Sequence, residues 1–212
     1  ATQPGFAGSP IIELNGSATT GKGLIVNASN TTIRGLVINR FVFIENPLTG
    51  KPSTFKAPGI DIYSIGAEAS FGGVVIEGNY IGTEVTGMLA RPNSGGILIR
   101  DGNNHRIGGT TPAQRNVISG NFGDGILIDN SDGYLVQGNF IGVAADGVTA
   151  LGNSVNGIGI GIISFTGVGS ATGRSLSAKT PALTGSRFDI WRTPKGPRDR
   201  SARVARSRLC GP

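Results

Sequence analysis

Gly125-Ile126-Leu127-Ile128, followed after a short polar segment by Val136-Gln137-Gly138-Asn139-Phe140-Ile141-Gly142, is one copy of a phrase that recurs along the chain. Repetition about every 30 residues is typical of proteins built from stacked structural repeats. The phrase therefore predicts the architecture better than it predicts an activity. Other copies of its first half are Gly59-Ile60-Asp61-Ile62, Gly96-Ile97-Leu98-Ile99 and Gly157-Ile158-Gly159-Ile160, and its second half recurs as Ile76-Glu77-Gly78-Asn79-Tyr80-Ile81-Gly82.

Each copy of the phrase predicts three short strands. The first contains Gly-Ile-x-Ile, with Leu24 and Val26 as an earlier, degenerate version. Apolar residues alternate along each strand, so that one face points inward. The second strands centre on Ile33, Ile76, Ile107 and Val136, and the third on Ile38, Ile81, Ile118 and Ile141.

Stacking of these strands predicts the fold class. Equivalent strands of successive copies would pair in parallel, about 4.8 Å apart. Crossover connections between parallel strands favour a right-handed winding. We therefore expect an all-β fold, a right-handed parallel β-helix or solenoid of about four to five coils.

Glycine and asparagine mark the predicted corners between the second and third strands, at Gly78-Asn79 and Gly138-Asn139. Glycine reaches positive φ without steric cost, and asparagine tolerates it. Asn side chains stacked in successive coils can also hydrogen-bond along the stack, which favours a structural role over a binding role. The variable segments 42–58, 82–95, 108–116 and 142–156 are predicted to be loops, where binding residues usually lie.

The net charge of +6 is concentrated at the C-terminal end. Residues 1–165 contain nine basic and eleven acidic residues, whereas residues 166–212 contain ten basic and two acidic ones. The repeat stops near Phe165, which divides the chain into a β-helix repeat domain, residues 1–165, and an irregular or disordered basic tail, residues 166–212.

Three interpretations of the tail remain open. It is an arm for nucleic acid, an acidic glycan or a membrane surface, or a disordered end with too little apolar content to fold. The third interpretation is out-of-frame translation of a gene whose proper frame continues the repeat. The abrupt loss of pattern favours the third, because native repeat arrays end in a capping unit. We therefore do not expect nucleic acid as a partner.

Composition argues against several other classes. No apolar run approaches the length of a transmembrane helix, and the start of the chain shows no signal peptide. The single cysteine, Cys210, excludes an internal disulfide framework. Cys210 and the single histidine, His105, are too few for a zinc site. By register His105 matches Thr31, Val74 and Tyr134, a position that does not demand imidazole chemistry.

Four stretches carry a family resemblance: Thr2-Gln3-Pro4-Gly5-Phe6, Ile11-Ile12-Glu13-Leu14-Asn15-Gly16, the run 32–41, and Arg106-Ile107-Gly108-Gly109-Thr110-Thr111-Pro112-Ala113-Gln114-Arg115-Asn116-Val117-Ile118-Ser119-Gly120-Asn121. They resemble bacterial right-handed parallel β-helix repeat proteins of the pectin-lyase-like superfold. The resemblance covers most of residues 1–165 and none of the tail. It implies a large secreted or cell-surface protein with further repeats in the same parent chain, and implies no assigned chemistry for the repeat itself.

Two functions remain open. The first is a structural or adhesion-type scaffold segment of an exported bacterial protein, contacting a polysaccharide or cell-surface glycan along one face. The alternative, implied by enzymes of the same superfold, is a polysaccharide lyase or glycoside hydrolase. Hydrolases of the superfold use an Asn-Thr-Asp segment, an Asp-Asp pair, Gly-His-Gly and Arg-Ile-Lys, and its lyases use clustered Asp ligands for Ca²⁺. The sequence contains none of these hydrolase motifs and no such Asp cluster.

Any site is expected directly after the first strands. Arg100 and Asp129 occupy equivalent positions there, and Asp101 follows one step later. Stacking would place Asp101 and Asp129 about 6–7 Å apart, a separation at which paired carboxylates can hydrolyse glycosides. Asp101 and Asp129 are therefore the catalytic candidates. Arg100 and Asp132 are the ligand-binding candidates, with Ca²⁺ as the one cofactor considered. The structural alternative is an exposed salt bridge between Arg100 and Asp129.

Two further pairs have structural interpretations. Glu84 and Asp146 lie in equivalent loops at non-matching positions, so we expect them to close turns locally rather than to form a repeated Ca²⁺ loop. Leu98 and Leu127 are expected to point outward as a small apolar stripe beneath a covering loop or the remainder of the chain.

Overall fold

The computed structural model describes residues 9–54, 56–64, 71–129, 133–161 and 187–190. Within these residues the chain is all-β, and its single helical element is a 3-10 turn, η1 (Pro112–Gln114). Three five-stranded sheets contain all the strands except those of one hairpin. The predicted tail, residues 166–212, lies outside the described residues apart from β17 (Arg187–Ile190), which pairs antiparallel with β14 (Tyr134–Gln137).

Each of the three predicted strands recurs in a sheet of its own, and the pairing is parallel except at β17. The first sheet contains β2 (Leu24–Val26), β7 (Pro58–Ile62), β10 (Gly95–Ile99), β13 (Ile126–Asp129) and β16 (Ile158–Gly161). The second contains β3 (Thr32–Arg34), β8 (Val75–Glu77), β11 (Arg106–Gly108), β14 and β17. The third contains β1 (Ile12–Asn15), β4 (Leu36–Asn39), β9 (Tyr80–Ile81), β12 (Val117–Ile118) and β15 (Phe140–Ile141).

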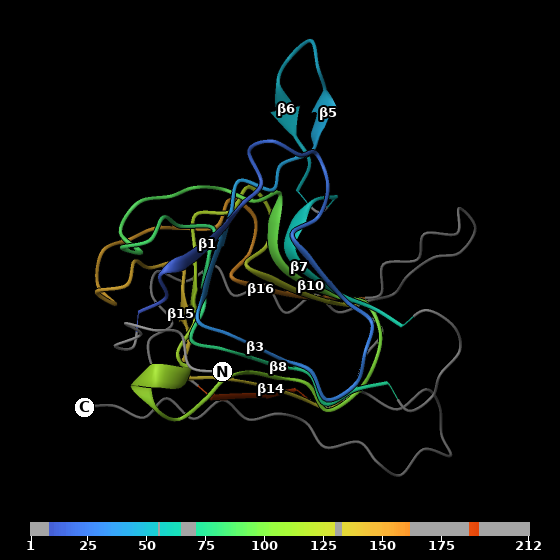
Figure 1. Cartoon of the computed structure of the whole chain (residues 1–212), viewed down its shortest axis with the longest axis vertical. Helices are drawn as coiled ribbons and strands as arrows, with labels where there is room; N and C mark the ends of the chain where they lie inside the picture. Colours follow the sequence, from blue (N-terminus) through green and yellow to red (C-terminus); the bar gives the residue numbers. More distant parts are fainter. Residues whose placement is uncertain (1–8, 55, 65–70, 130–132, 162–186, 191–212) are drawn as a thin grey trace.

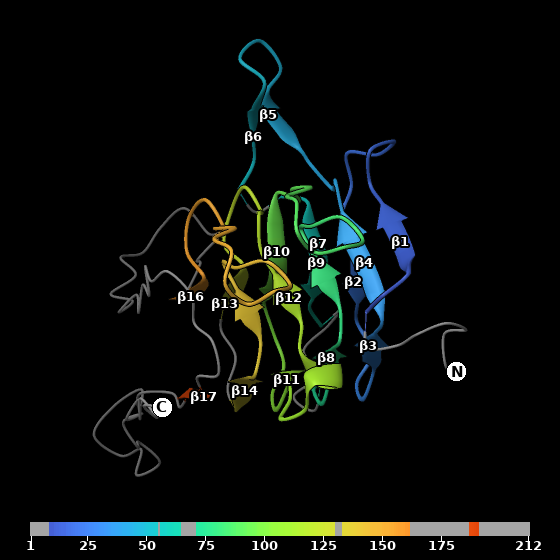
Figure 2. The ribbon, with the colours of Figure 1, turned by 90° about the vertical axis from the view of Figure 1, so that its left-hand side faces the viewer.

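The chain visits the three sheets in the same order four times. We call each visit a coil: β2–β3–β4 is coil 1, β7–β8–β9 is coil 2, β10–β11–β12 is coil 3 and β13–β14–β15 is coil 4. Figure 1 shows the three sheets as sides around a common interior, and Figure 2 shows strands of the third sheet lying side by side.

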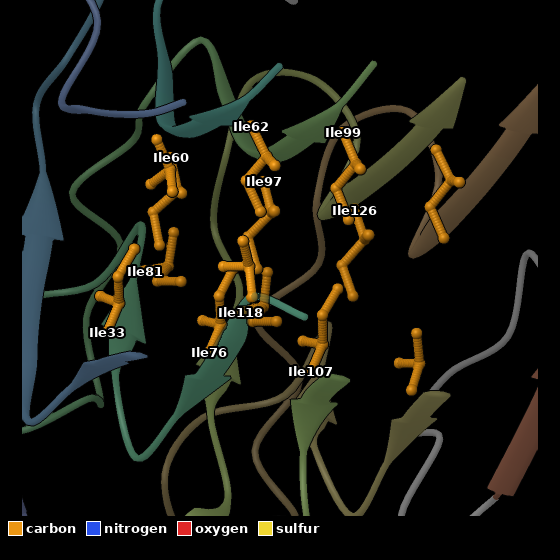
Figure 3. Packing of buried hydrophobic residues seen from close by; sticks show 14 of the residues in the cluster. Ile33, Ile60, Ile62, Ile76, Ile81, Ile97, Ile99, Ile107, Ile118 and Ile126 are labelled. Atoms are coloured by element: carbon orange, nitrogen blue, oxygen red, sulfur yellow. The ribbon is translucent and has the colours of Figure 1, made fainter. Parts of the chain in front are cut away.

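The strand register confirms the predicted stacking. Ile97 is the Cα partner of Ile60 on one side and of Ile126 on the other, and Ile126 is in turn the partner of Ile158. The central residues of the second and third sheets stack in the same way, as predicted. Isoleucines of all three sheets point into one interior (Figure 3), where most are fully buried. Burial of this apolar surface is the main force that holds the coils together.

One predicted loop has structure of its own. Residues 42–58 contain an antiparallel hairpin of β5 (Ile44–Asn46) and β6 (Lys51–Pro52), which projects from the sheets (Figures 1 and 2). The hairpin could not be predicted from the sequence, because prolines interrupt the segment and its strands show no apolar alternation. Pro52 is tolerated because both strands of a two-stranded hairpin are edge strands.

Two loops stack against the outer side of the third sheet. Thr83 bridges Ala90 in the loop after β9, and Val143 bridges Ala150 in the loop after β15. The Ala145 N–H donates to the Gly87 carbonyl at 3.0 Å, which joins the two loops. They cover the outward side chains of the sheet, so that Val37, Tyr80 and Val117 are buried there. The loop after β15 thus repeats the structure of the loop after β9, two coils further along the chain.

Glycine is required where these loops lie on aromatic rings. Gly87 and Gly147 have φ of +73° and +72°. A Cβ at Gly87 would lie 2.9 Å from Cε2 of Tyr80, and one at Gly147 would lie 2.6 Å from Cζ of Phe140. The same glycine-on-ring packing is therefore found in two loops that lie two coils apart.

Candidate functional site

Two of the predicted site residues lie at the ends of strands of the first sheet: Arg100 follows β10 and Asp129 is the last residue of β13. Ile99 is the Cα partner of Ile128, so Arg100 and Asp129 occupy equivalent positions, as predicted. Asp129 is buried at the end of β13, and Asp101 is partly exposed. Asp132 lies outside the described residues. A carboxylate pair formed by Asp101 and Asp129 stays a prediction.

Arg100 binds an acid that the sequence analysis did not single out. Its Nε donates to Asp61 Oδ1 at 3.1 Å, and its Nη2 donates to Asp61 Oδ2. Arg100 therefore pairs with Asp61, and the alternative salt bridge of Arg100 with Asp129 stays a prediction. Asp61 points outward in the middle of β7, its side chain is fully buried, and a buried carboxylate is stable only when a cation or hydrogen bonds compensate it.

A second cation and an aromatic ring complete this cluster. Lys22 Nζ lies 2.6 Å from Asp61 Oδ2. The centroid of the Tyr63 ring lies 5.3 Å from Lys22 Nζ and 4.6 Å from Arg100 Cζ, within the range of cation–π attraction. We refer to Lys22, Asp61, Tyr63 and Arg100 as the Asp61 cluster. It joins an acid of coil 2 to bases from the segment before β2 and from the end of β10.

The outer side of the second sheet carries a similar arrangement around Glu77. Arg34 Nη1 lies 3.8 Å from Glu77 Oε1, and Arg106 Nη2 donates to Glu77 Oε2 at 2.8 Å. Gln114 Nε2 also donates to Glu77 Oε2, at 3.2 Å. Again an acid of coil 2 is bound by bases of coils 1 and 3. Both arrangements join coil 2 to coil 3 and to the chain that precedes coil 2.

Two ladders of asparagines run through the corners. In the first, Asn79 Nδ2 donates to Asn116 Oδ1 at 3.1 Å, and Asn116 Nδ2 donates to Asn139 Oδ1 at 2.8 Å. This confirms the stacking predicted for Asn79 and Asn139 and adds Asn116 between them. These side chains also bond backbone groups of neighbouring coils, including the carbonyls of Ile33 and Ile76.

The second ladder was missed by the sequence analysis. It lies between the third and first sheets, where Asn93 Nδ2 donates to Asn121 Oδ1 at 3.1 Å and Asn121 Nδ2 donates to Asn153 Oδ1 at 2.9 Å. A signal was present in the sequence, since an asparagine stands three or four residues before three of the Gly-Ile pairs. Variable spacing in these loops concealed it.

His105 is buried beneath the outer residues of the site. Its ring stacks on Tyr134 with centroids 5.3 Å apart and meets the Phe71 ring edge-on at 5.6 Å. Nδ1 accepts from the Val74 N–H at 3.1 Å, which leaves Nε2 as the donor to the Asp101 carbonyl at 3.3 Å. Both ring nitrogens are thus used in holding the corner before β11.

Burial lowers the pKa of His105 below its ordinary value, and the hydrogen bond to the Asp101 carbonyl opposes this shift only in part. The His105 ring is therefore neutral in the folded protein. A proton on Nδ1 would remove the hydrogen bond that Nδ1 accepts from the Val74 N–H. The folded state then binds fewer protons than the unfolded state, so His105 destabilises the fold as pH falls below the unfolded pKa, about 6.5.

Acidification should therefore weaken the fold through His105. Below pH about 6.5 we expect the free energy of unfolding to fall by up to about 1.4 kcal/mol per pH unit. Asp124, whose pKa is raised mainly by burial, acts in the opposite direction. Urea titrations of the wild type and of His105→Phe, at about pH 7.5 and about pH 5.5, isolate the contribution of His105 to the pH dependence of stability. An equal pH dependence in both proteins would contradict the assignment.

Glu84 and Asp146 close their loops locally, as predicted. Glu84 accepts from the backbone N–H groups of Thr86, Met88 and Leu89 at 2.8–3.2 Å. Asp146 Oδ1 accepts from the N–H groups of Val148 and Thr149, both at 2.9 Å. The longer Glu reaches the turn from a position two residues earlier, which explains why the two acids do not align.

The pKa values of these loop acids follow from the same hydrogen bonds. Partial burial opposes the shift at Glu84, but the bonds from Thr86, Met88 and Leu89 outweigh it and lower the pKa. At Asp146 the bond from the Thr149 hydroxyl is the largest cause of a lowered pKa. Both acids remain ionised and occupied with their own turns.

The remaining observations concern the predicted apolar stripe, metals and membranes. Leu98 is buried and Leu127 is half-buried, so the stripe is not an exposed surface.

Among the described residues, no three His, Cys, Asp or Glu side chains come together as a metal site would require. In the same part of the chain no helix has the length and apolarity needed to cross a membrane.

Comparisons with protein-family models, with curated proteins and with solved structures found no match to this chain.

Proposed function

We propose that residues 1–165 are a segment of a right-handed parallel β-helix, related to the bacterial β-helix repeat proteins, that serves as an elongated scaffold or adhesion stalk. Three parallel sheets visited four times in the same order support the coiled architecture. The hand follows from the strong preference of parallel crossovers for right-handed connections. Export to the cell surface and further repeats in the parent chain follow from the family resemblance.

One observation carries the scaffold proposal: within the part of the chain that the structure describes, the buried polar groups Asp61, Glu77, His105 and the corner asparagines contact their own chain. Asp61 and Glu77 each bind cations of two other coils. His105 bonds backbone on both sides of its ring. The buried asparagines bond one another and the backbone. A catalytic site needs at least one such group directed at a substrate, whereas these groups are directed at the coils of their own chain.

Glycan contact along one face is the second part of the proposal. The outer side of the first sheet presents Lys22 and Arg100, each about 30% exposed, beside Tyr63. Cationic and aromatic side chains at a rigid surface are suited to hydroxyl-rich and charged sugars.

The enzymatic alternative gives a direct test. Asp101→Asn together with Asp129→Asn removes both candidate catalytic charges with little change in volume. We expect glycan binding to stay close to that of the wild type, and neither protein to release reducing ends from polysaccharides. If the wild type depolymerises a polysaccharide and the double variant does not, the scaffold proposal is wrong.

A further inference from the structure

The Asp61 cluster contains more positive charge than its acid requires. The Asp61 side chain is fully buried, whereas Lys22 and Arg100 are 30% and 29% exposed. Both cations contact the same oxygen, Oδ2. They therefore lie next to each other over the carboxylate, and Lys22, Asp61 and Arg100 together carry a net charge of +1.

The two cations also have more hydrogen-bond donors than Asp61 takes. An ammonium has three N–H donors and a guanidinium five. Asp61 takes one contact from Lys22 and two from Arg100. The remaining donors belong to partly exposed groups. The Tyr63 ring, close to both cations, restrains them, so an incoming anion would order few additional side chains.

We infer that the outer side of the Lys22–Arg100 pair binds a sulfate ester of a polysaccharide. This inference rests on the proposed glycan contact and names the group that is recognised. A sulfate ester carries a single negative charge, which matches the surplus of the cluster. Its three terminal oxygens can accept from both cations at once, whereas a carboxylate offers two oxygens. Charge-assisted bonds of this kind are the strong ones.

The Glu77 arrangement lacks the same features. Arg34 Nη1 lies at 3.8 Å from the carboxylate, beyond hydrogen-bond distance, and Gln114 occupies part of the acid. No aromatic ring contacts Arg34 or Arg106 among the described cation–π pairs. The geometry therefore points to the Asp61 cluster as the specific site.

Acetylation of lysines in the full chain, followed by mass spectrometry, measures how accessible each lysine is, including Lys22 in the proposed site. Three polymers of one backbone serve as probes: dextran, carboxymethyl dextran and dextran sulfate, the last two at equal charge density. Dextran sulfate at about ten times its Kd should slow acetylation of Lys22 about tenfold. Lys51, exposed on the β5–β6 hairpin, is the control and should change by less than about twofold.

Affinity measurements on matched variants complete the test. Lys22→Gln retains the Arg100–Asp61 pair and should therefore fold, but it should bind dextran sulfate more weakly than Lys51→Gln, which has the same net charge. The basic residues 166–212 are identical in both variants, so any contribution they make cancels in the comparison.

Three outcomes would overturn the inference. They are equal protection of Lys22 and Lys51, equal protection of Lys22 by the carboxymethyl and sulfate polymers, and equal affinities of the two variants. If the first of these results is obtained with dextran sulfate while neutral dextran binds, the inference fails and glycan contact is still supported. The scaffold proposal fails on a different result, the depolymerisation lost in the double aspartate variant.

Discussion

Replacing Asn116 by alanine should lower the free energy of unfolding by about 3–5 kcal/mol. The Asn116 side chain is fully buried and joins three coils. Its Oδ1 accepts from the backbone N–H and Nδ2 of Asn79, and its Nδ2 donates to the Ile76 carbonyl and to Asn139. Alanine would leave buried partners on both sides without hydrogen bonds, and each such group costs about 1–3 kcal/mol.

Chemical denaturation monitored by circular dichroism measures this loss. Asn46→Ala is the matched control, because Asn46 is exposed on the β5–β6 hairpin and its side chain accepts from the nearby N–H of Leu48. We expect the control to change stability by less than about 1 kcal/mol. Similar effects of the two substitutions would contradict the role assigned to the ladder.

Replacing Ile97 by alanine should destabilise the fold by about 2–5 kcal/mol. Ile97 is 1% exposed and stacks between Ile60 and Ile126 in the interior. The cavity left by truncation is bordered by coils on both sides, whose own isoleucine stacking limits collapse into it.

Ile25→Ala provides the comparison, measured in the same denaturation experiment. Ile25 lies in a strand of the same sheet, but it is the Cα partner of the outward residue Asp61 and is 52% exposed. Its truncation should cost less than about 1 kcal/mol. If Ile25→Ala were as damaging as Ile97→Ala, the assignment of inward and outward faces would be wrong.

The strands and their register could be predicted because one side chain type repeats at one position. A strand shifted by a single residue would turn its isoleucines from the interior to the surface. Ile60, Ile97, Ile126 and Ile158 therefore fix the alignment of the first sheet by themselves. The corner asparagines Asn79 and Asn139 were predictable for a similar reason, since they follow glycines at the same point of the phrase.

The ionic contacts could not be predicted in the same way. Arg100 has equivalent residues in both neighbouring coils, and its long side chain can reach either coil. The deciding fact is that Asp61 is fully buried on the outer side of β7 and needs compensation. Burial on the outer face depends on what covers the sheet, which a pattern of alternation does not record.

The second asparagine ladder and the paired loops show the limit of a one-coil repeat. Asn93 and Asn153 stand after long loops, whereas Asn121 follows a short corner. The loop of coil 2 meets its equivalent in coil 4 over Gly120 of coil 3, whose N–H donates to the Leu151 carbonyl. Packing between coils that are not consecutive follows from loop length, and strand periodicity gives no measure of it.

Cross-linking of cysteine pairs tests the central claim, the in-register stacking of successive coils, most directly. In a Cys210→Ser background, Thr32→Cys with Val75→Cys places two thiols on register partners of coils 1 and 2. Parallel neighbours lie about 4.8 Å apart, within the range of a disulfide. Thr32→Cys with Arg106→Cys spans two steps, because Val75 is the partner of Arg106 as well as of Thr32. Under mild oxidation the first pair should form an intramolecular disulfide and the second should not. Efficient cross-linking of the two-step pair, or none in the adjacent pair, would contradict the stacked-coil account.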